Sequence, residues 1–123
     1  MNWYDTLEKS SLTPPSIIFS LVWPILYLLM FIGFAMVLSS NQSPIIILIF
    51  ILQIGLNLSW SPIFFQLHNI QLALYIIGLL FLSVLVMTYM FYQQNTVAGL
   101  LQGPYILWLG LAFYLNWYIY KHN

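Results

Sequence analysis

Aromatic and amide side chains recur at helical spacing along two apolar stretches of the sequence. Trp23 and Tyr27 are four residues apart, and Gln53, Asn57 and Trp60 follow one another at intervals of four and three residues. Residues three or four apart lie on one face of a helix. Because an unpartnered amide is costly in hydrocarbon, Gln53 and Asn57 are expected to point toward another helix, a ligand or trapped water. A pocket of indole and phenol rings with a few amides would suit a flat, apolar and partly polar ligand.

A third stripe, on the last apolar stretch, adds a further tryptophan and a further amide: Tyr105, Trp108, Ala112 and Leu115, with Asn116 beside them. The alternative for all the amides is a purely structural role. Buried amides can simply join helices, each contributing about 0.6–2 kcal/mol. Both roles stay open for Gln53 and Asn116, whereas Asn57 favours the ligand role.

The tryptophans also have a structural alternative, which is anchoring at the membrane interface. Anchoring suits Trp3 and Trp117 best. Trp23, Trp60 and Trp108 lie a turn or more inside their apolar stretches. These three are therefore expected to line the interior.

Groups that could catalyse a reaction or bind a metal are scarce. The sequence from Ile17 to Tyr120 contains no Asp, Glu, Lys or Arg, so a carrier coupled to protons or ions has no such group at membrane depth. His68 and His122 are expected in a turn and at the C-terminus, where they face water and do not form a zinc site. Cysteine is absent, and no serine is accompanied by a base and an orienting acid. We predict no catalytic residue, no metal site and no required cofactor, and favour a binding protein over an enzyme.

The composition indicates an integral membrane protein. Of the 123 residues, 63% are hydrophobic and only 3% are charged, whereas about a quarter of the residues in a soluble domain are charged. So few charges suffice only if most of the surface faces lipid. The formal net charge is zero, which gives no sign of a nucleic-acid partner. We therefore expect the lipid bilayer to surround most of the protein.

Prolines and short polar runs divide the apolar sequence into segments of membrane-spanning length. A helix needs about 20 residues to cross the hydrocarbon core. The prediction is an all-α, polytopic transmembrane helix bundle, a single domain over residues 1–123, with four spans at about 14–38, 44–65, 70–92 and 97–120.

Particular residues are expected to shape the ends of these spans. Thr13 and Ser43 can cap the first two helices, each followed directly by proline at the helix start. Pro62 is expected to distort the last turn of the second span, and Gly103 with Pro104 to bend the fourth near its beginning. An even number of spans puts both termini on one side, and Lys9 and Lys121 favour the cytoplasmic side of a bacterial inner or organellar membrane.

Four motifs in this order together resemble the tryptophan-rich sensory protein/translocator protein family, TspO/MBR, formerly called peripheral-type benzodiazepine receptors. They are Trp3-Tyr4-x-x-Leu7-x-Lys9, Pro14-Pro15-x-x-x-Phe19-x-x-Val22-Trp23-x-x-Leu26-Tyr27, Gln53-x-x-Leu56-Asn57-x-x-Trp60-Ser61-Pro62-x-Phe64-Phe65 and Pro104-Tyr105-x-x-Trp108-x-x-x-Ala112-x-x-Leu115-Asn116.

The resemblance implies a helical bundle, often dimeric, that binds porphyrins and other tetrapyrroles, synthetic isoquinoline and benzodiazepine ligands and, in eukaryotic members, cholesterol. Carried over position by position, it implies a ligand pocket with Pro14 and Pro15 in a covering loop and a lining of seven residues: Trp23, Tyr27, Asn57, Trp60, Trp108, Ala112 and Leu115. Family members usually have five spans, so the first family helix is expected to be absent from this sequence. Ile76 stands where members often carry an acid, and His68 stands near a usual arginine, which argues against a proton-linked step.

The resemblance favours a membrane protein that binds a porphyrin or haem-type tetrapyrrole, or another flat hydrophobic molecule such as a sterol, and acts as a sensor or translocator. Two alternatives remain: a light-dependent porphyrin-degrading enzyme, and a truncated structural partner of a full-length relative. Because four short helices enclose little volume, a homodimer is expected. The candidate contact faces are those around Gly55, Gly99 and Gly110.

Overall fold

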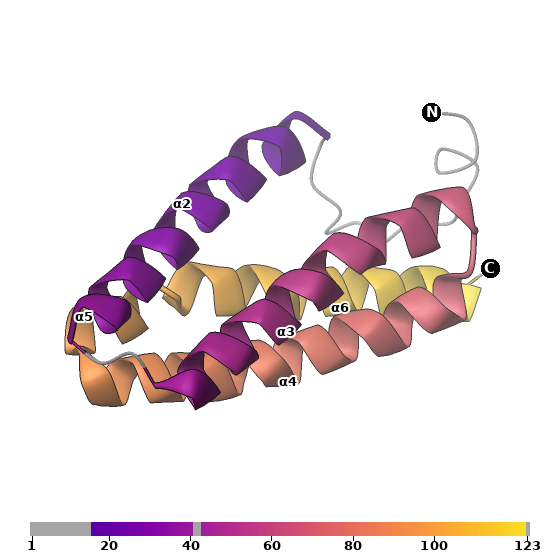
Figure 1. Ribbon diagram of the computed structural model, residues 1–123. Coiled ribbons are helices and arrows are strands. Elements are labelled where there is room, and N and C mark those ends of the chain that lie inside the picture. The colour runs from indigo at the N-terminus through magenta and orange to yellow at the C-terminus, as the bar shows by residue number, and fades with distance from the viewer. Residues whose placement is uncertain (1–15, 41–42, 123) are drawn as a thin grey trace.

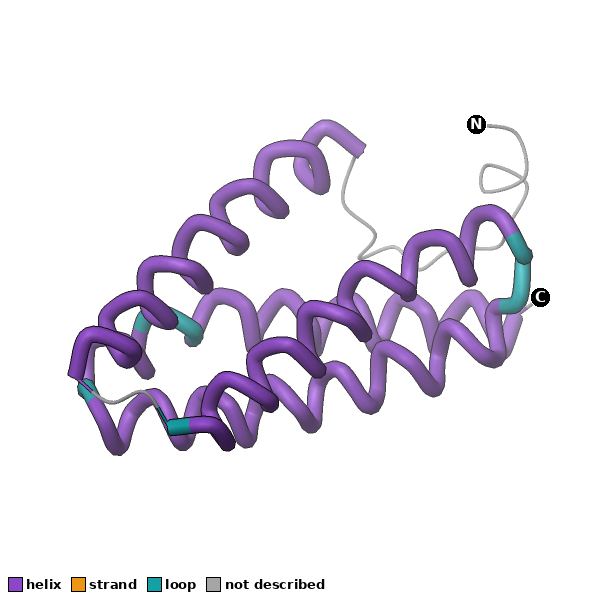
Figure 2. The backbone as a smooth tube through the Cα atoms, viewed as in Figure 1, coloured by secondary structure: helices purple, strands orange, loops and turns teal. Residues whose placement is uncertain are grey.

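The computed structural model describes residues 16–40 and 43–122, and all of their regular elements are helical (Figures 1 and 2). Four stretches are long and apolar enough to cross a membrane: Leu21–Ser39, Pro44–Gln66, Ile70–Gln94 and Thr96–His122. The predicted all-α bundle with four spans is therefore confirmed. The elements are α2 (Ser16–Ser40), α3 (Pro44–Ser61), the π-helical turn η1 (Pro62–Gln66), α4 (Ile70–Gln94), α5 (Thr96–Leu100) and α6 (Gly103–His122). Thr13, Pro14 and Pro15 lie outside the described residues.

The second span changes its winding at Pro62, as the sequence predicts. Proline has no N–H to continue the α-helical pattern, and the chain continues as η1, where the amide of Leu67 donates to the carbonyl of Pro62 at 3.1 Å. The predicted cap at the other end is only half right. Ser43 occupies the N-cap position, but its side chain makes no capping hydrogen bond. Pro44 at the first helical position has already removed one of the amides that would need a partner.

The fourth span is broken more sharply than a bend. The chain forms α5, turns at Leu101 and Gln102, and starts again as α6 at Gly103. Asn95 is the N-cap residue of α5, and its side-chain oxygen accepts hydrogen bonds from the amides of Val97 (3.0 Å) and Ala98 (3.2 Å). This is a standard N-cap arrangement, which satisfies amides that have no partner within the helix.

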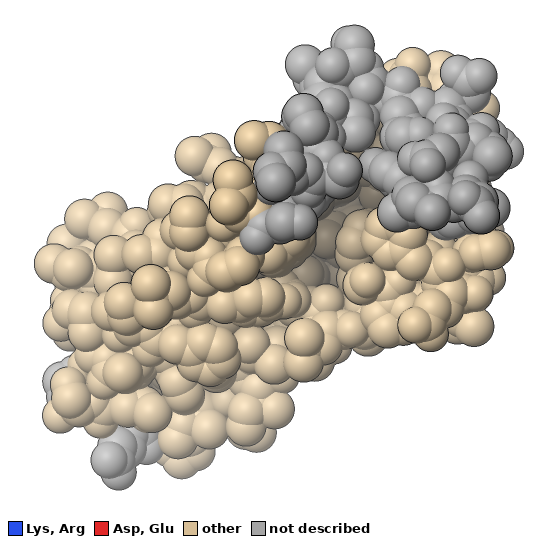
Figure 3. Space-filling view, turned by 90° about the horizontal axis from the view of Figure 1, so that it is seen from above, with Lys and Arg blue, Asp and Glu red and all other residues tan. Residues whose placement is uncertain are grey.

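The helices differ in how closely they pack. Figure 1 shows α3, α4 and α6 running alongside one another, whereas α2 meets the others near α5 and diverges from α6 toward its N-terminal end. Large apolar side chains face outward along every span, as expected where the solvent is hydrocarbon. The described surface in Figure 3 shows no Lys, Arg, Asp or Glu.

Candidate functional site

The indole rings of Trp23 on α2 and Trp108 on α6 meet across the bundle. Their centroids are 6.2 Å apart and their planes are at 88°, an edge-to-face contact. Tyr27, one turn after Trp23, lies 5.8 Å from the Trp23 ring. All three side chains are half-buried. The first and third stripes expected from the sequence thus face one another, and their rings form one aromatic cluster.

A chain of hydrogen bonds continues from this cluster into the centre of the bundle. The Tyr27 hydroxyl donates to Asn57 Oδ1, Asn57 Nδ2 donates to the Tyr105 hydroxyl oxygen at 2.8 Å, and the Tyr105 hydroxyl donates to Gln53 Oε1 at 2.8 Å. Gln53 Nε2 then donates to the sulfur of Met30 at 3.2 Å. The Gln53 and Tyr105 side chains are fully buried. The chain therefore ties α2, α3 and α6 together and satisfies amides that would be costly alone.

Trp60 takes part in a separate structural contact. Its indole N–H donates to Asn116 Oδ1 at 2.8 Å, and Asn116 Nδ2 donates to the carbonyl of Ile70 at 3.2 Å. The Trp60 ring also packs against Phe64, with centroids 5.1 Å apart. The donor of Trp60 is thus used to join α3, α6 and the start of α4, which favours the structural role left open for Asn116.

The other two predicted lining residues lie further along α6. Ala112 is half-buried and packs against the main hydrophobic core, and Leu115 is buried. Their side chains are apolar and make no hydrogen bonds, so they contribute only to the shape of the interior.

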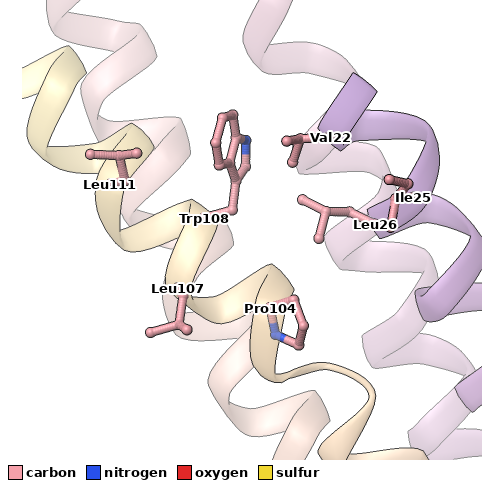
Figure 4. Close-up of a pocket in the computed structure, with 7 residues that line it drawn as sticks. All are labelled: Val22, Ile25, Leu26, Pro104, Leu107, Trp108 and Leu111. Carbon is pink, nitrogen blue, oxygen red and sulfur yellow. The ribbon is translucent and has the colours of Figure 1, made fainter. Parts of the chain in front are cut away.

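An apolar groove of about 450 Å³ lies between α2 and α6, beside the Trp23–Trp108 contact (Figure 4). Of the predicted site residues that the structure describes, only Trp108 lines it. Leu107 is 78% exposed, so the groove opens sideways at the level of the membrane spans. The other lining residues are aliphatic or proline: Val22, Ile25, Leu26, Pro104, Leu107 and Leu111.

The mixed aromatic and amide pocket expected from the sequence is therefore divided in two. In the interior, Asn57 bonds to Tyr27 and Tyr105, and Gln53 bonds to Tyr105 and Met30. The α2–α6 groove beside them is apolar. Val22, Leu26 and Pro104 belong to the family motifs, but their spacing does not predict a groove, because similar side chains cover every lipid-facing surface.

Gln102 is a structurally important residue that the sequence analysis missed. Its side chain is fully buried in the turn between α5 and α6, and its Nε2 donates to the carbonyl of Leu29 on α2 at 3.4 Å. Gly33 of α2 lies directly against this amide, where a Cβ atom would collide with Nε2. A glutamine beside a turn gives no sign of this contact unless the position of α2 is known.

The described residues contain no group of three or more His, Cys, Asp or Glu side chains that could hold a metal ion. His68 lies in the loop between η1 and α4, and His122 ends α6, both away from the aromatic cluster. The aromatic cluster, the hydrogen-bonded amides and the apolar groove are the features that this region offers for non-covalent contacts.

Comparison with known proteins places these features in a family. The family model described as TspO/MBR matches residues 1–121. The chain is similar to Protein CrtK of Rhodobacter capsulatus, with 36% identity over 98% of this chain and 78% of that protein. It is 32% identical to the tryptophan-rich sensory protein of Cereibacter sphaeroides, over 98% of this chain and 77% of that protein. The Homo sapiens translocator protein is 29% identical over 100% of this chain and 76% of that protein.

Proposed function

This chain belongs to the TspO/MBR family of membrane sensor and translocator proteins, and we propose that it binds a tetrapyrrole such as a porphyrin between α2, α3 and α6. The observation that carries the proposal is the contact of Trp23 with Trp108 directly beside the Tyr27–Asn57 hydrogen bond. It provides aromatic faces for a flat macrocycle and an amide for a polar group of the guest.

The energetics of such a site favour a large, flat ligand. Aromatic pairs contribute about 0.5–1.5 kcal/mol beyond the burial of their area. Apolar surface adds about 25 cal/mol for each Å² removed from water, but this term is much smaller for a guest that already resides in the bilayer. Stacking and hydrogen bonding are therefore the source of selectivity, which assigns Trp23, Trp108 and Asn57 the leading roles.

Titration with protoporphyrin, followed by quenching of tryptophan fluorescence in detergent or nanodiscs, tests the proposal. Trp108→Ala removes one aromatic face and is expected to weaken binding about tenfold, which corresponds to about 1.4 kcal/mol. Trp117→Phe is the matched control, because Trp117 is exposed near the end of α6. Equal affinity of Trp108→Ala and the parent protein would contradict the proposed site.

We further propose that the termini lie on the cytoplasmic side, on the basis of Lys9 and Lys121. A reporter enzyme fused to the C-terminus, active only in one compartment, checks this. Activity on the opposite side of the membrane would refute the orientation without affecting the binding proposal.

A further inference from the structure

The two halves of α2 are held in the bundle by different means. In the C-terminal half, Met30, Gly33 and Val37 are buried, and Gly33 packs directly on Gln102. Phe34 stacks on Phe50 of α3 with parallel rings 3.8 Å apart. This half is a docked helix with close backbone and ring contacts.

In the part of the chain that the structure describes, fewer close contacts hold the N-terminal half of α2 in the bundle. Within residues 21–28, Leu26 is the one buried side chain. The α2–α6 groove separates this half from α6 (Figure 4). Pro24 also removes a helical hydrogen bond from this half, because it has no N–H to donate to the carbonyl of Ser20. Among the described residues, its specific contacts across the bundle are the Trp23–Trp108 edge contact and the Tyr27–Asn57 hydrogen bond.

The hydrogen bond to Asn57 is also the contact with which a guest must compete. Asn57 Oδ1 accepts from Tyr27, and its Nδ2 donates to Tyr105. Tyr105 is fully buried and is itself bonded to Gln53, so the Asn57–Tyr105 side of the network is fixed. Tyr27 is half-buried on the loosely held part of α2 and is therefore the partner that can be displaced.

We propose that the Tyr27–Asn57 hydrogen bond is a latch. A guest that carries an N–H or O–H donor replaces the Tyr27 hydroxyl on Asn57 Oδ1, and the N-terminal half of α2 then moves outward and widens the α2–α6 groove. This inference rests on the proposed function in placing the guest at Asn57. It adds a chemical requirement, which is a hydrogen-bond donor on the guest, and it adds a moving element.

The guest needs a donor because Asn57 Oδ1 loses its hydrogen bond when the Tyr27 hydroxyl is displaced. A guest with a donor exchanges one hydrogen bond for another, whereas a guest without one leaves a buried carbonyl oxygen unsatisfied. The propionic acid groups of protoporphyrin carry an O–H donor when burial in the apolar groove keeps them protonated, whereas its pyrrole N–H groups point into the centre of the ring. The nickel complex of its dimethyl ester has the same ring and neither donor. Protoporphyrin is expected to bind the parent protein about tenfold more tightly than the nickel ester.

The direction in which Tyr27→Phe changes the affinity shows whether the Tyr27 hydroxyl competes with the guest for Asn57 or holds the guest itself. The substitution keeps the aromatic ring but removes the competing hydroxyl, so the affinity for both probes should rise about two- to tenfold, the equivalent of one hydrogen bond. Asn57→Leu should abolish the preference for protoporphyrin over the nickel ester. Tyr120→Phe, at an exposed tyrosine near the end of α6, is the control and should change neither affinity. A lower affinity of Tyr27→Phe would mean that the hydroxyl holds the guest, and would overturn the proposal.

Distance measurements between spin labels test the movement without relying on affinity. The chain has no cysteine, so pairs of labels can be placed at will on exposed positions. Leu21→Cys with Leu58→Cys reports on the N-terminal half of α2 relative to α3, and Ile32→Cys with Leu48→Cys reports on the docked half. Both protoporphyrin and the Tyr27→Phe change alone should shift the first pair to longer distances and leave the second pair unchanged.

The two arms of the experiment separate the latch from the proposed function. If protoporphyrin does not bind, the proposed function fails, and the ligand-free comparison of parent protein with Tyr27→Phe still decides whether the bond holds α2. An unchanged first pair in Tyr27→Phe would overturn the latch even if porphyrin binds. Should Tyr27→Phe not fold, Asn57→Leu breaks the same bond from α3 and must give the same shift.

Discussion

The indole N–H of Trp60 on α3 donates to Asn116 on α6 at 2.8 Å, and the amide of Asn116 in turn donates to the backbone of α4 at Ile70. Trp60 thus helps to hold α3, α4 and α6 together. Trp23 and Trp108 instead contact each other beside the groove. All three indoles are predicted to line the interior, and their contacts in the structure distinguish them.

The Trp60–Asn116 contact is expected to contribute to stability and to have little effect on ligand binding. Asn116→Leu leaves the indole donor without its acceptor, and we expect the free energy of unfolding to fall by about 1–2 kcal/mol. Unfolding with sodium dodecyl sulfate in mixed micelles measures this. A double-mutant cycle with Trp60→Phe should give a coupling of about 0.6–1.7 kcal/mol. Strictly additive effects would show that the contact is not a stabilising pair.

Gly99 is expected to tolerate no larger residue, because α5 lies directly on the end of α4. A Cβ atom at Gly99 would lie 2.6 Å from the Cα and 2.8 Å from the backbone nitrogen of Tyr92, and backbone atoms cannot move aside as a side chain can. Gly99→Ala should cost roughly 1–3 kcal/mol in the free energy of unfolding. At Gly55 an added Cβ meets nothing within 4 Å, so Gly55→Ala is the matched control. Equal stability of the two variants would contradict the close packing of α5.

The same geometry ranks the glycine faces considered for a dimer. Gly99 is occupied within the chain by Tyr92, and a Cβ atom at Gly110 would meet Phe81 at 3.8 Å, whereas the surroundings of Gly55 are open. If the protein forms a homodimer, α3 around Gly55 is the face we expect it to use. Gly55→Leu should then increase the monomer fraction in native-membrane cross-linking, with Leu82→Ala on the exposed face of α4 as the control. Cross-linking that is unaffected by Gly55→Leu would exclude this face.

Illumination of the porphyrin complex distinguishes binding from degradation. Trp23 and Trp108 lie where a bound porphyrin would sensitise their oxidation, and each oxidised indole is consumed. We therefore expect at most about one equivalent of porphyrin to be consumed for each protein under light, with oxidation of nearby indoles. Absorbance at the porphyrin band during addition of successive equivalents measures this. Repeated turnover would favour the enzymatic alternative.

Much of the fold could be predicted because prolines and polar residues determine where apolar helices begin and end. Pro44 begins α3 and Pro62 begins η1, as expected from proline chemistry. The separation of α5 from α6 was expected only as a bend near Gly103. In the turn between α5 and α6, the Gln102 side chain donates to the carbonyl of Leu29 on α2. That contact joins distant parts of the sequence and leaves no local pattern.

The site could be predicted only in part, since the sequence shows which faces point inward but not which residues meet. Spacing correctly brought Trp23 and Trp108 to one cluster. The Tyr27–Asn57 bond and the groove depend on how α2 is tilted. In a membrane bundle, lipid-facing and interior positions both carry aliphatic side chains, so amphipathic periodicity cannot reveal that tilt.

Nuclear magnetic resonance of the ¹⁵N-labelled indoles during protoporphyrin titration tests the central claim most directly. The chain has five tryptophans, and the ring current of a stacked macrocycle moves the signals of those nearest to it. We expect large, saturable shifts of the Trp23 and Trp108 indole signals and an unmoved Trp117 signal. Shifts confined to Trp117, or the same small shift at every indole, would show that porphyrin associates with the outer surface, and would contradict a binding site between α2, α3 and α6.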